Sequence, residues 1–387
     1  GLMIKALAGG GGRGMRVVTE AGGLAEAFQQ CKNEARNAFG RDDVYVEQWL
    51  PSARHVEIQV LGDCKGNIIA LGERECSLQR RHQKIMEITP SPALSASLRE
   101  RMYDAAIQMA SAVKYQGIGT FEFLVETAHG GVNNPQAEHF YFMEANPRLQ
   151  VEHTITEMVS GVDIVNTQIR LAAGDSLASL GLEKAPCSQG VSIQARINLE
   201  TLHVDGSTRV SCGTLTAYEL PSGPGVRVDG YGYAGYTTHP GYDSLLAKII
   251  VHGSDYATAT RRLYRALCEC RIEGVANNLH LLQNLLRVPQ WQHHDFDTRF
   301  LDRHFALVLE TSGNAHPHLF FSTPAHAGIT SPTMVDIPAG CLPLMAPSAG
   351  VLVSWLVQPG DEIGAGQTVA ILEAMKMEFL VKAEQGG

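Results

Sequence analysis

The chain has 387 residues, of which 44% are hydrophobic and 18% charged, and a formal net charge of −9. This composition is typical of a globular protein with two or three domains, and the lack of a Lys/Arg block argues against nucleic-acid binding. The longest apolar runs, such as LLAKII from Leu245, are too short to span a bilayer, and the eight cysteines form no CxxC pair, so we expect a cytoplasmic protein with no membrane partner and no disulfide framework.

Hydrophobic patterning divides the chain into four parts and predicts an α+β fold. Residues 1–190 alternate strand-like and helix-like segments, and residues 191–308 hold shorter strand patterns followed by the helix pattern DYATATRRLYRALCECRI. Residues 309–342 are rich in Pro, Gly, Ser, Thr and His and are a predicted linker, whereas residues 343–387 hold short β-runs between glycine-containing turns. Because Gly1 is followed at once by a strand pattern, we expect the sequence to begin inside a domain.

A glycine run near the beginning has the composition of a phosphate-binding loop. In AGGGGRGMRVV, consecutive glycines let backbone N–H groups approach phosphate oxygens, and Arg13 and Arg16 add positive charge. The run matches neither GxxxxGK[ST] nor a GxGxxG that opens a helix, so a plain flexible hairpin explains it equally well. The candidate phosphate contacts are Gly10, Gly11, Gly12 and Gly14.

The segment YFMEANPRLQVEH has a polar residue at every second position. Alternate side chains of a strand share one face, which predicts a single strand with one polar side. That face would suit a divalent cation at one end, an anion beside a guanidinium, and a carboxylate base at the other end. A solvated edge strand is the alternative, and Pro147 favours an edge or a strand end. The polar residues are Glu144, Asn146, Arg148, Gln150 and Glu152.

Three further patterns add polar residues to the same candidate site. GTFEFLVE sets Glu122 opposite two phenylalanines, where its carboxylate could share Mg²⁺ with Glu144. The other two patterns are RHVEIQVLG, which alternates His55, Glu57 and Gln59 with apolar residues, and ECSLQRRHQKIME, which holds Gln79, His82 and Lys84. Each residue alone is more often an ordinary strand or loop residue, but together they indicate an ATP- and Mg²⁺-dependent ligase.

These residues resemble the biotin carboxylase component of biotin-dependent carboxylases, which belongs to the ATP-grasp superfamily. The motifs are KALAGGGGRGMRVV, RHVEIQVLGD, ERECSLQRRHQK, GTFEFLVE and MEANPRLQVEHTITEMVSGVDIV, continued by QARIN, YDSLLAKIIVHG and RIEGVANNLHLLQNLL. The resemblance implies a partial ATP-grasp domain in residues 1–190, without the family's N-terminal α/β subdomain, and a biotin carboxylase C-terminal domain in residues 191–308. Gln194, where an acidic residue is common, and His239, in a loop often richer in proline, depart from the family pattern.

The resemblance also implies a role for each matching residue. The implied nucleotide contacts are Lys5, Gly10, Gly11, Gly12, Gly14, Glu47, Leu50, His55, Gln79 and His82. The implied Mg²⁺ or Mn²⁺ ligands are Glu122, Glu144 and Asn146. The implied bicarbonate pocket contains Lys84, Arg148, Gln150 and Val151, with Glu152 as the base that deprotonates bicarbonate and Arg196 facing the biotin enolate.

The C-terminal segment resembles part of an all-β biotinyl carrier domain. TVAILEA and EFLVKA are predicted strands, and AMKM forms the hairpin tip that presents Lys376 to a biotin protein ligase. The surrounding LEAMKME and the upstream MAPSAG predict biotinylation of Lys376, rather than a solvated strand lysine or a lipoyl domain with Asp-Lys-Ala at its tip. Such carriers hold two quasi-symmetric halves, so we expect residues 343–387 to be a partial domain.

The resemblance implies ATP, bicarbonate, covalent biotin and a carboxyltransferase domain or subunit as partners, and a homo-oligomeric assembly. A direct connection from carboxylase to carrier is typical of acyl-CoA carboxylases of the acetyl- or propionyl-CoA type. Pyruvate and urea carboxylases, which usually place large domains before the carrier, are the alternatives, as is a catalytically inert biotinylated carrier. The carboxyltransferase selects the acyl acceptor, so this sequence does not identify it.

Overall fold

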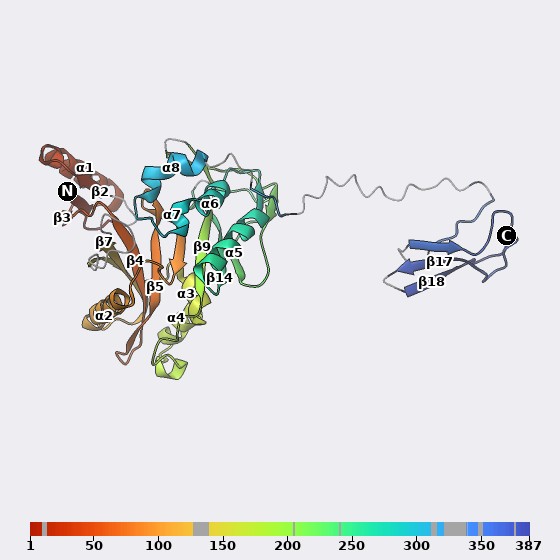
Figure 1. The fold of residues 1–387 in the computed structure, drawn as a ribbon, viewed down its shortest axis with the longest axis horizontal. Helices are drawn as coiled ribbons and strands as arrows, with labels where there is room; N and C mark the ends of the chain where they lie inside the picture. Colours follow the sequence, from red (N-terminus) through yellow and green to blue (C-terminus); the bar gives the residue numbers. More distant parts are fainter. Residues whose placement is uncertain are drawn as a thin grey trace. The chain divides into compact units, whose positions relative to one another are not determined.

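The computed structural model describes residues 1–9, 14–126, 139–203, 206–239, 241–310, 316–320, 338, 340–346, 351–374 and 377–387. The chain divides into two compact units, Gly1–Phe320 and Phe321–Gly387, and each is described by itself (Figure 1). The expected α+β fold is confirmed. Among the described helices, none combines the length and apolar character that crossing a bilayer would require.

An eight-stranded antiparallel sheet organises the first unit, in the order β13-β14-β9-β6-β5-β4-β7-β8. Because β9 pairs with β6, strands from residues 191–308 continue the sheet that begins in residues 1–190. In chain order the strands are β4 (Ala53–Gly62), β5 (Ile68–Arg80), β6 (Gln83–Thr89), β7 (Gly117–Glu126), β8 (Phe140–Asn146), β9 (Val191–Asn198), β13 (Val226–Gly230) and β14 (Leu245–Gly253).

The two faces of this sheet differ in polarity because side chains alternate along each strand. On one face, apolar residues of β4 pack beneath α2 (Ala96–Ala112), and those of β9 and β14 pack beneath α5 (Tyr256–Glu269) (Figure 1). Both helices begin at capped N-termini, where the side chains of Ser95 and Asp255 accept backbone N–H bonds. The opposite face carries polar residues and is covered by α3 (His153–Ser160) and, beside β7, α4 (Ile164–Ala172).

A small sheet precedes the large one, in the order β2-β1-β3, and α1 (Leu24–Phe39) packs against it. Its strands are β1 (Leu2–Ala6), β2 (Met15–Val18) and β3 (Val44–Gln48), and η1 (Ala21–Gly23) leads into α1. The chain re-enters β2 through Gly14, whose backbone is left-handed with a φ of +68°. A side chain there would also collide with Ala6, 2.8 Å from the Cβ position, so both φ and packing require glycine.

The remaining described elements of the first unit are two strand pairs and four helices. Two short antiparallel pairs are β10 (Glu200–Leu202) with β11 (Thr208–Val210), and β12 (Ala217–Glu219) with β15 (Arg271–Glu273). The short helices are η2 (Ala178–Leu180), α6 (Leu279–Leu285), α7 (Pro289–Gln292) and α8 (Phe300–Glu310). Residues of α6, α7 and α8 complete the apolar core beneath α5, with Trp291 fully buried among them.

The second unit contains a three-stranded antiparallel sheet in the order β16-β17-β18. The strands are β16 (Val351–Trp355), β17 (Thr368–Ala374) and β18 (Met377–Lys382), so both strands predicted around AMKM are confirmed. Val369, Ala370 and Val381 belong to its small core. Ala374 pairs with Met377, and the intervening residues, including the predicted biotin site Lys376, lie outside the described residues.

The buried Trp291 provides a test of the core. Its ring stacks on Phe296 at a centroid distance of 5.9 Å, and its indole N–H donates to the Thr260 hydroxyl over 3.0 Å. Trp291→Ala should lower the unfolding free energy by about 3–5 kcal/mol, because it leaves a cavity and an unpaired hydroxyl. Urea denaturation followed by circular dichroism measures this. Val113→Ala, at a 69% exposed position, should change it by less than about 0.5 kcal/mol; equal effects would contradict this assignment of the core.

Candidate active site

Five charged side chains on the polar face of the large sheet form a continuous row of alternating charge, here called the charge chain. Its members, in order of contact, are Glu57, Lys84, Glu152, Arg196 and Glu87. Lys84 Nζ lies 2.6 Å from Glu57 Oε2 and 2.6 Å from Glu152 Oε1, and Arg196 lies 2.8 Å from Glu152 Oε2 and also bonds Glu87. All three carboxylates are buried. Glu152 is therefore held between two cations.

A fully buried arginine supports the charge chain from β5. Arg74 bonds Glu57, and its other guanidinium nitrogens donate to Gln59 and Gln150 over 2.9 and 3.1 Å. It also reaches Thr120 on β7 and Thr156 on α3. A buried guanidinium is tolerated only when its donors are satisfied, and here they bind three strands to the helix that follows Glu152.

The pKa values of the two carboxyl groups that share Arg196 are shifted in opposite directions. Burial raises the pKa of Glu87 above its ordinary value, despite the nearby guanidinium. Burial also opposes ionisation of Glu152, but Lys84, Arg196 and Arg74 together hold the pKa of that carboxyl well below its ordinary value. The carboxylates of Glu57 and Glu152 keep the pKa of Lys84 high despite its burial. Glu152 is consequently an ionised carboxylate, available to accept a proton.

A second cluster gathers around Glu122 on β7. His55 Nε2 lies 2.7 Å from Glu122 Oε2, while the amides of Asn146 and Gln150 donate to Oε1 over 2.9 and 2.6 Å. Gln79 Nε2 lies 2.6 Å from the other ring nitrogen of His55. Glu144 stands directly opposite Glu122 in the β7–β8 register, and Asn146 also donates to it. The predicted metal ligands Glu122, Glu144 and Asn146 are thus neighbours.

This oxygen-rich group has the chemistry of a Mg²⁺ site, because Mg²⁺ prefers carboxylate and amide oxygens. One carboxylate oxygen of Glu122 also lies 3.4 Å from Lys84, which connects the predicted metal ligands to the charge chain. A partly different set, His55, Glu57 and Glu122, offers ligand atoms within 4.8 Å of one another. The lysine beside Glu57 competes with a cation there, so the group with Glu144 and Asn146 fits Mg²⁺ better.

The prediction that residues 144–152 form one strand was wrong beyond Asn146. Strand β8 ends there, because Pro147 has no N–H to continue the pairing, and α3 begins at His153 with Glu152 as its N-cap residue. Arg148 is exposed and bonds Asn146 and its neighbouring backbone, so it does not join the charge chain. Gln150 and Glu152 are buried in the loop and reach the site from it.

The predicted nucleotide contacts of the small sheet include one ion pair. Lys5 Nζ on β1 lies 2.6 Å from Glu47 on β3, and half-buried Leu50 follows that strand. Burial, then the charge of Glu47 and, more weakly, that of Glu144, raise the pKa of Tyr45 to about 12. Exposed His82 lies in the tight β5–β6 turn, where its φ is +65°. Gly10, Gly11 and Gly12 lie outside the described residues.

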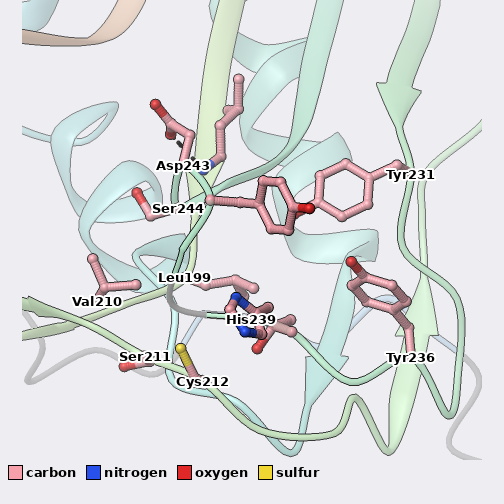
Figure 2. Close-up of a pocket in the computed structure, with 12 residues that line it drawn as sticks. Leu199, Val210, Ser211, Cys212, Tyr231, Tyr236, His239, Asp243 and Ser244 are labelled. Carbon is pink, nitrogen blue, oxygen red and sulfur yellow. Dashed lines mark hydrogen bonds between the residues drawn. The ribbon is translucent and has the colours of Figure 1, made fainter.

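A separate cavity of about 360 Å³ lies near the end of β9 (Figure 2). Tyr231, Tyr236 and His239 lie around it, and Leu199, three residues beyond Arg196, forms part of its wall. None of its described lining residues belongs to the predicted site. The candidate chemistry therefore resides in the buried charge chain and not in this opening.

Two buried residues that bond members of the charge chain, Arg74 and Glu87, were missing from the predicted site. The alternation of β4 placed Gln59 beside His55 and Glu57, and this arrangement is confirmed by the shared contacts of Glu57 and Gln59 with Arg74. No comparable alternation pointed to Arg74 or Glu87, because their partners lie on other strands or in the loop before α3 and become known only from the order of strands in the sheet.

Comparison with known proteins identifies the domains of this chain. The description "Carbamoyl-phosphate synthase L chain, ATP binding domain" matches residues 1–180, "Biotin carboxylase C-terminal domain" matches residues 194–303, and "Biotin-requiring enzyme" matches residues 343–387. The chain carries the ATP-grasp and C-terminal domains of a biotin carboxylase and a biotin/lipoyl domain at its C-terminus.

Three known proteins illustrate the extent of this relationship. Pyruvate carboxylase of Staphylococcus aureus is 44% identical over 306 residues, which are 78% of this chain and 26% of that protein. The biotin carboxylase domain of Hydrogenobacter thermophilus 2-oxoglutarate carboxylase, solved with MgADP and bicarbonate, has a TM-score of 0.73 at 39% identity, over 79% of this chain and 65% of that one. A solved single-chain long-chain acyl-CoA carboxylase has a TM-score of 0.63 at 36% identity, over 88% of this chain and 32% of that one. The chain thus spans less than two thirds of each.

The environment of Glu122 predicts a pH-dependent contribution to stability. Burial alone would raise the pKa of Glu122, but His55, Lys84 and Gln150 lower it from 4.5 to about 2. Its carboxylate therefore stabilises the fold fully above pH 4.5, and this contribution, about 3 kcal/mol, is lost as pH falls toward 2. The difference in unfolding free energy between the unchanged protein and Glu122→Gln should be largest above pH 4.5 and shrink below it.

Urea unfolding in EDTA at pH 7, 4.5 and 3 measures this difference. Glu100→Gln, on the exposed side of α2, is the matched control and should give a small difference that hardly changes over the range. A constant difference for Glu122→Gln would show that Glu122 is not selectively stabilised as a carboxylate.

Proposed function

We propose that this protein catalyses the ATP- and bicarbonate-dependent carboxylation of biotin carried on Lys376. The observation that carries the proposal is the buried, ionised Glu152 between Lys84 and Arg196, at 2.6 and 2.8 Å. A carboxylate that cations hold ionised can accept the bicarbonate proton, and the same cations stabilise the negative charge that develops during attack on phosphorus. The similarity to a domain solved with MgADP and bicarbonate supports this reading.

In this proposal, the surrounding residues bind bicarbonate, Mg²⁺, the nucleotide and biotin. Bicarbonate is bound by Lys84, Arg148, Gln150 and the backbone at Val151. Arg196 stabilises the enolate oxygen of biotin. Bound Mg²⁺ (or Mn²⁺) would be held by Glu122, Glu144 and Asn146, where it neutralises phosphate charge. The proposed nucleotide contacts are Lys5, Gly10, Gly11, Gly12, Gly14, Glu47, Leu50, His55, Gln79 and His82. Biotin on Lys376 supplies the nitrogen that receives the carboxyl group.

We further propose four functional regions along the chain. Residues 1–190 form the ATP-grasp part and residues 191–308 the carboxylase C-terminal part. Residues 309–342 connect these to the carrier, residues 343–387. The family matches at 1–180, 194–303 and 343–387 are compatible with these boundaries. Biotin protein ligase would load the carrier, and a carboxyltransferase domain or subunit would receive the carboxyl group in a homo-oligomeric, cytoplasmic assembly.

The finer proposal is the first half-reaction of an acyl-CoA carboxylase of the acetyl- or propionyl-CoA type. The short interval between carboxylase and carrier supports it, as does the long-chain acyl-CoA carboxylase, similar over 88% of this chain. Pyruvate carboxylase is the second candidate, favoured by 44% identity to the Staphylococcus aureus protein. Supplying acetyl-CoA, propionyl-CoA or pyruvate, in turn, to the protein with its carboxyltransferase distinguishes them by which one incorporates labelled bicarbonate.

The direct test of biotin carboxylation is bicarbonate-dependent ATP cleavage with added free biotin. Glu152→Gln should lower the rate by at least about a hundredfold, because a general base contributes that much or more, and should leave ATP affinity within a few-fold. Activity in the unchanged protein would exclude an inert carrier, and Glu100→Gln provides the matched exposed control. Unaltered turnover by Glu152→Gln would overturn its assignment as the base.

The proposed biotin site is tested independently of catalysis. Lys376→Arg keeps the positive charge but removes the amine that forms the amide bond with biotin. Protein expressed with a biotin protein ligase should then lose all capture on avidin. Lys382→Arg, an exposed lysine of β18, is the control and should be captured like the unchanged protein. Retained capture of Lys376→Arg would mean that biotin is attached elsewhere.

A further inference from the structure

Lys248 is a nearly buried lysine on β14, on the same face of the sheet as Arg196. The two residues are direct partners in the β14–β9 register, and Lys248 is only 9% exposed. Its ammonium donates to the backbone carbonyl of Val151 over 3.0 Å and lies 3.1 Å from Asp229 Oδ2 on β13. A buried ammonium requires such partners, and here one of them immediately precedes Glu152.

The loop before α3 is fixed at three successive residues. The side chain of Gln150 bonds Arg74 and Glu122, the carbonyl of Val151 bonds Lys248, and the carboxylate of Glu152 bonds Lys84 and Arg196. Of these, the bond from Lys248 is the one that holds the backbone directly from a neighbouring strand. The peptide plane between Val151 and Glu152 is therefore oriented from β14.

A chain of ion pairs holds α3 itself to the same two strands. Asp229 accepts from Arg227 over 2.9 and 3.1 Å, and Arg227 Nη1 donates to Glu157 on α3 over 2.7 Å. The other carboxylate oxygen of Glu157 accepts the backbone N–H of Ile164, over 2.8 Å, at the start of α4. The series Lys248–Asp229–Arg227–Glu157, here called the α3 clamp, thus joins β14 and β13 to the residue that precedes the N-cap and to the second turn of the helix.

We infer that Lys248 is a positioning residue for Glu152, acting through the Val151 carbonyl as the first member of the α3 clamp. The inference rests on the proposed function of Glu152 as the base. Lys248 itself bonds no member of the charge chain in the described structure, and its contribution is to fix where the Glu152 carboxylate stands between Lys84 and Arg196. Small displacements of a reacting group lower the rate strongly, whereas the binding of ATP depends on other residues.

The experiment compares Lys248→Met, which keeps the length of the side chain and removes the charge, with Lys248→Arg, which retains a charged donor. Lys65→Met, at an exposed turn between β4 and β5, is the matched control. Bicarbonate-dependent ATP cleavage gives kcat and the KM for ATP. Amide hydrogen exchange of residues 150–157, measured on the same samples, reports the loop without requiring activity.

Lys248→Met should lower kcat by about tenfold to a hundredfold with less than about a threefold change in the KM for ATP, and should speed exchange in residues 150–157. Lys248→Arg should fall between Lys248→Met and the unchanged protein, and Lys65→Met should match the latter. The inference is overturned if kcat of Lys248→Met stays within twofold, or if exchange accelerates equally throughout the sheet, which would indicate general destabilisation.

A third readout separates this inference from the proposed function. Burial lowers the pKa of His153, the hydrogen bond with the Gln150 carbonyl and the charge of Glu157 raise it, and the charges of Lys248 and Arg74 lower it further. Lys248→Met should therefore raise that pKa in an NMR titration, as Lys65→Met should not. If the unchanged protein cleaves no ATP with bicarbonate, the proposed function fails, while the exchange result still decides whether Lys248 holds the loop, and the titration checks only that its charge lies near His153.

Discussion

The structure of this site depends on the mutual neutralisation of buried charges. Glu57, Glu152 and Glu87 are each almost completely removed from water, and an isolated carboxylate there would be strongly destabilising. Lys84 and Arg196 stand between them, so every carboxylate of the charge chain touches a cation. Because removal of one member leaves its neighbours uncompensated, the positions of all five are determined together. Such an arrangement is preorganised, which is what stabilisation of developing charge requires.

The antiparallel sheet makes this arrangement possible. The order β9-β6-β5-β4-β7 brings Arg196, Lys84, Arg74, Glu57 and Glu122 side by side from segments more than a hundred residues apart. Side chains alternate between the two faces of each strand. The apolar residues that stabilise the fold therefore lie on the face beneath α2 and α5, and the charged residues lie on the opposite face. Residues beyond 190 contribute Arg196 and Lys248, so the regions matched by the ATP-binding and C-terminal families share one sheet and one site.

Local patterns in the sequence predicted the features that depend on one strand alone, namely its position and the face to which each side chain points. The alternation in β4 correctly placed His55, Glu57 and Gln59 on one face, and the two strands around AMKM were found where expected. The same reasoning failed at residues 147–152, where alternation continues past the end of β8. There Gln150 and Glu152 lie in a loop, and their side chains are buried because they bond Arg74 and Lys84. The alternation of polar and apolar residues in the sequence does not predict these contacts. Arg148, equally regular in sequence, is exposed.

The sequence did not predict contacts between side chains of neighbouring strands, because these contacts depend on the order of the strands in the sheet. Glu87 illustrates why this matters for chemistry. Taken alone it is an ordinary strand glutamate, but in the folded protein it shares Arg196 with Glu152, and the two carboxyl groups are driven apart in pKa. Burial favours protonation of Glu87, which lies at the end of the charge chain with one cation, whereas Glu152 lies between two and stays ionised. The difference follows from their positions in the row and not from residue type. Sequence patterns can identify candidate acids and bases here, but the folded structure decides in which direction each pKa is shifted.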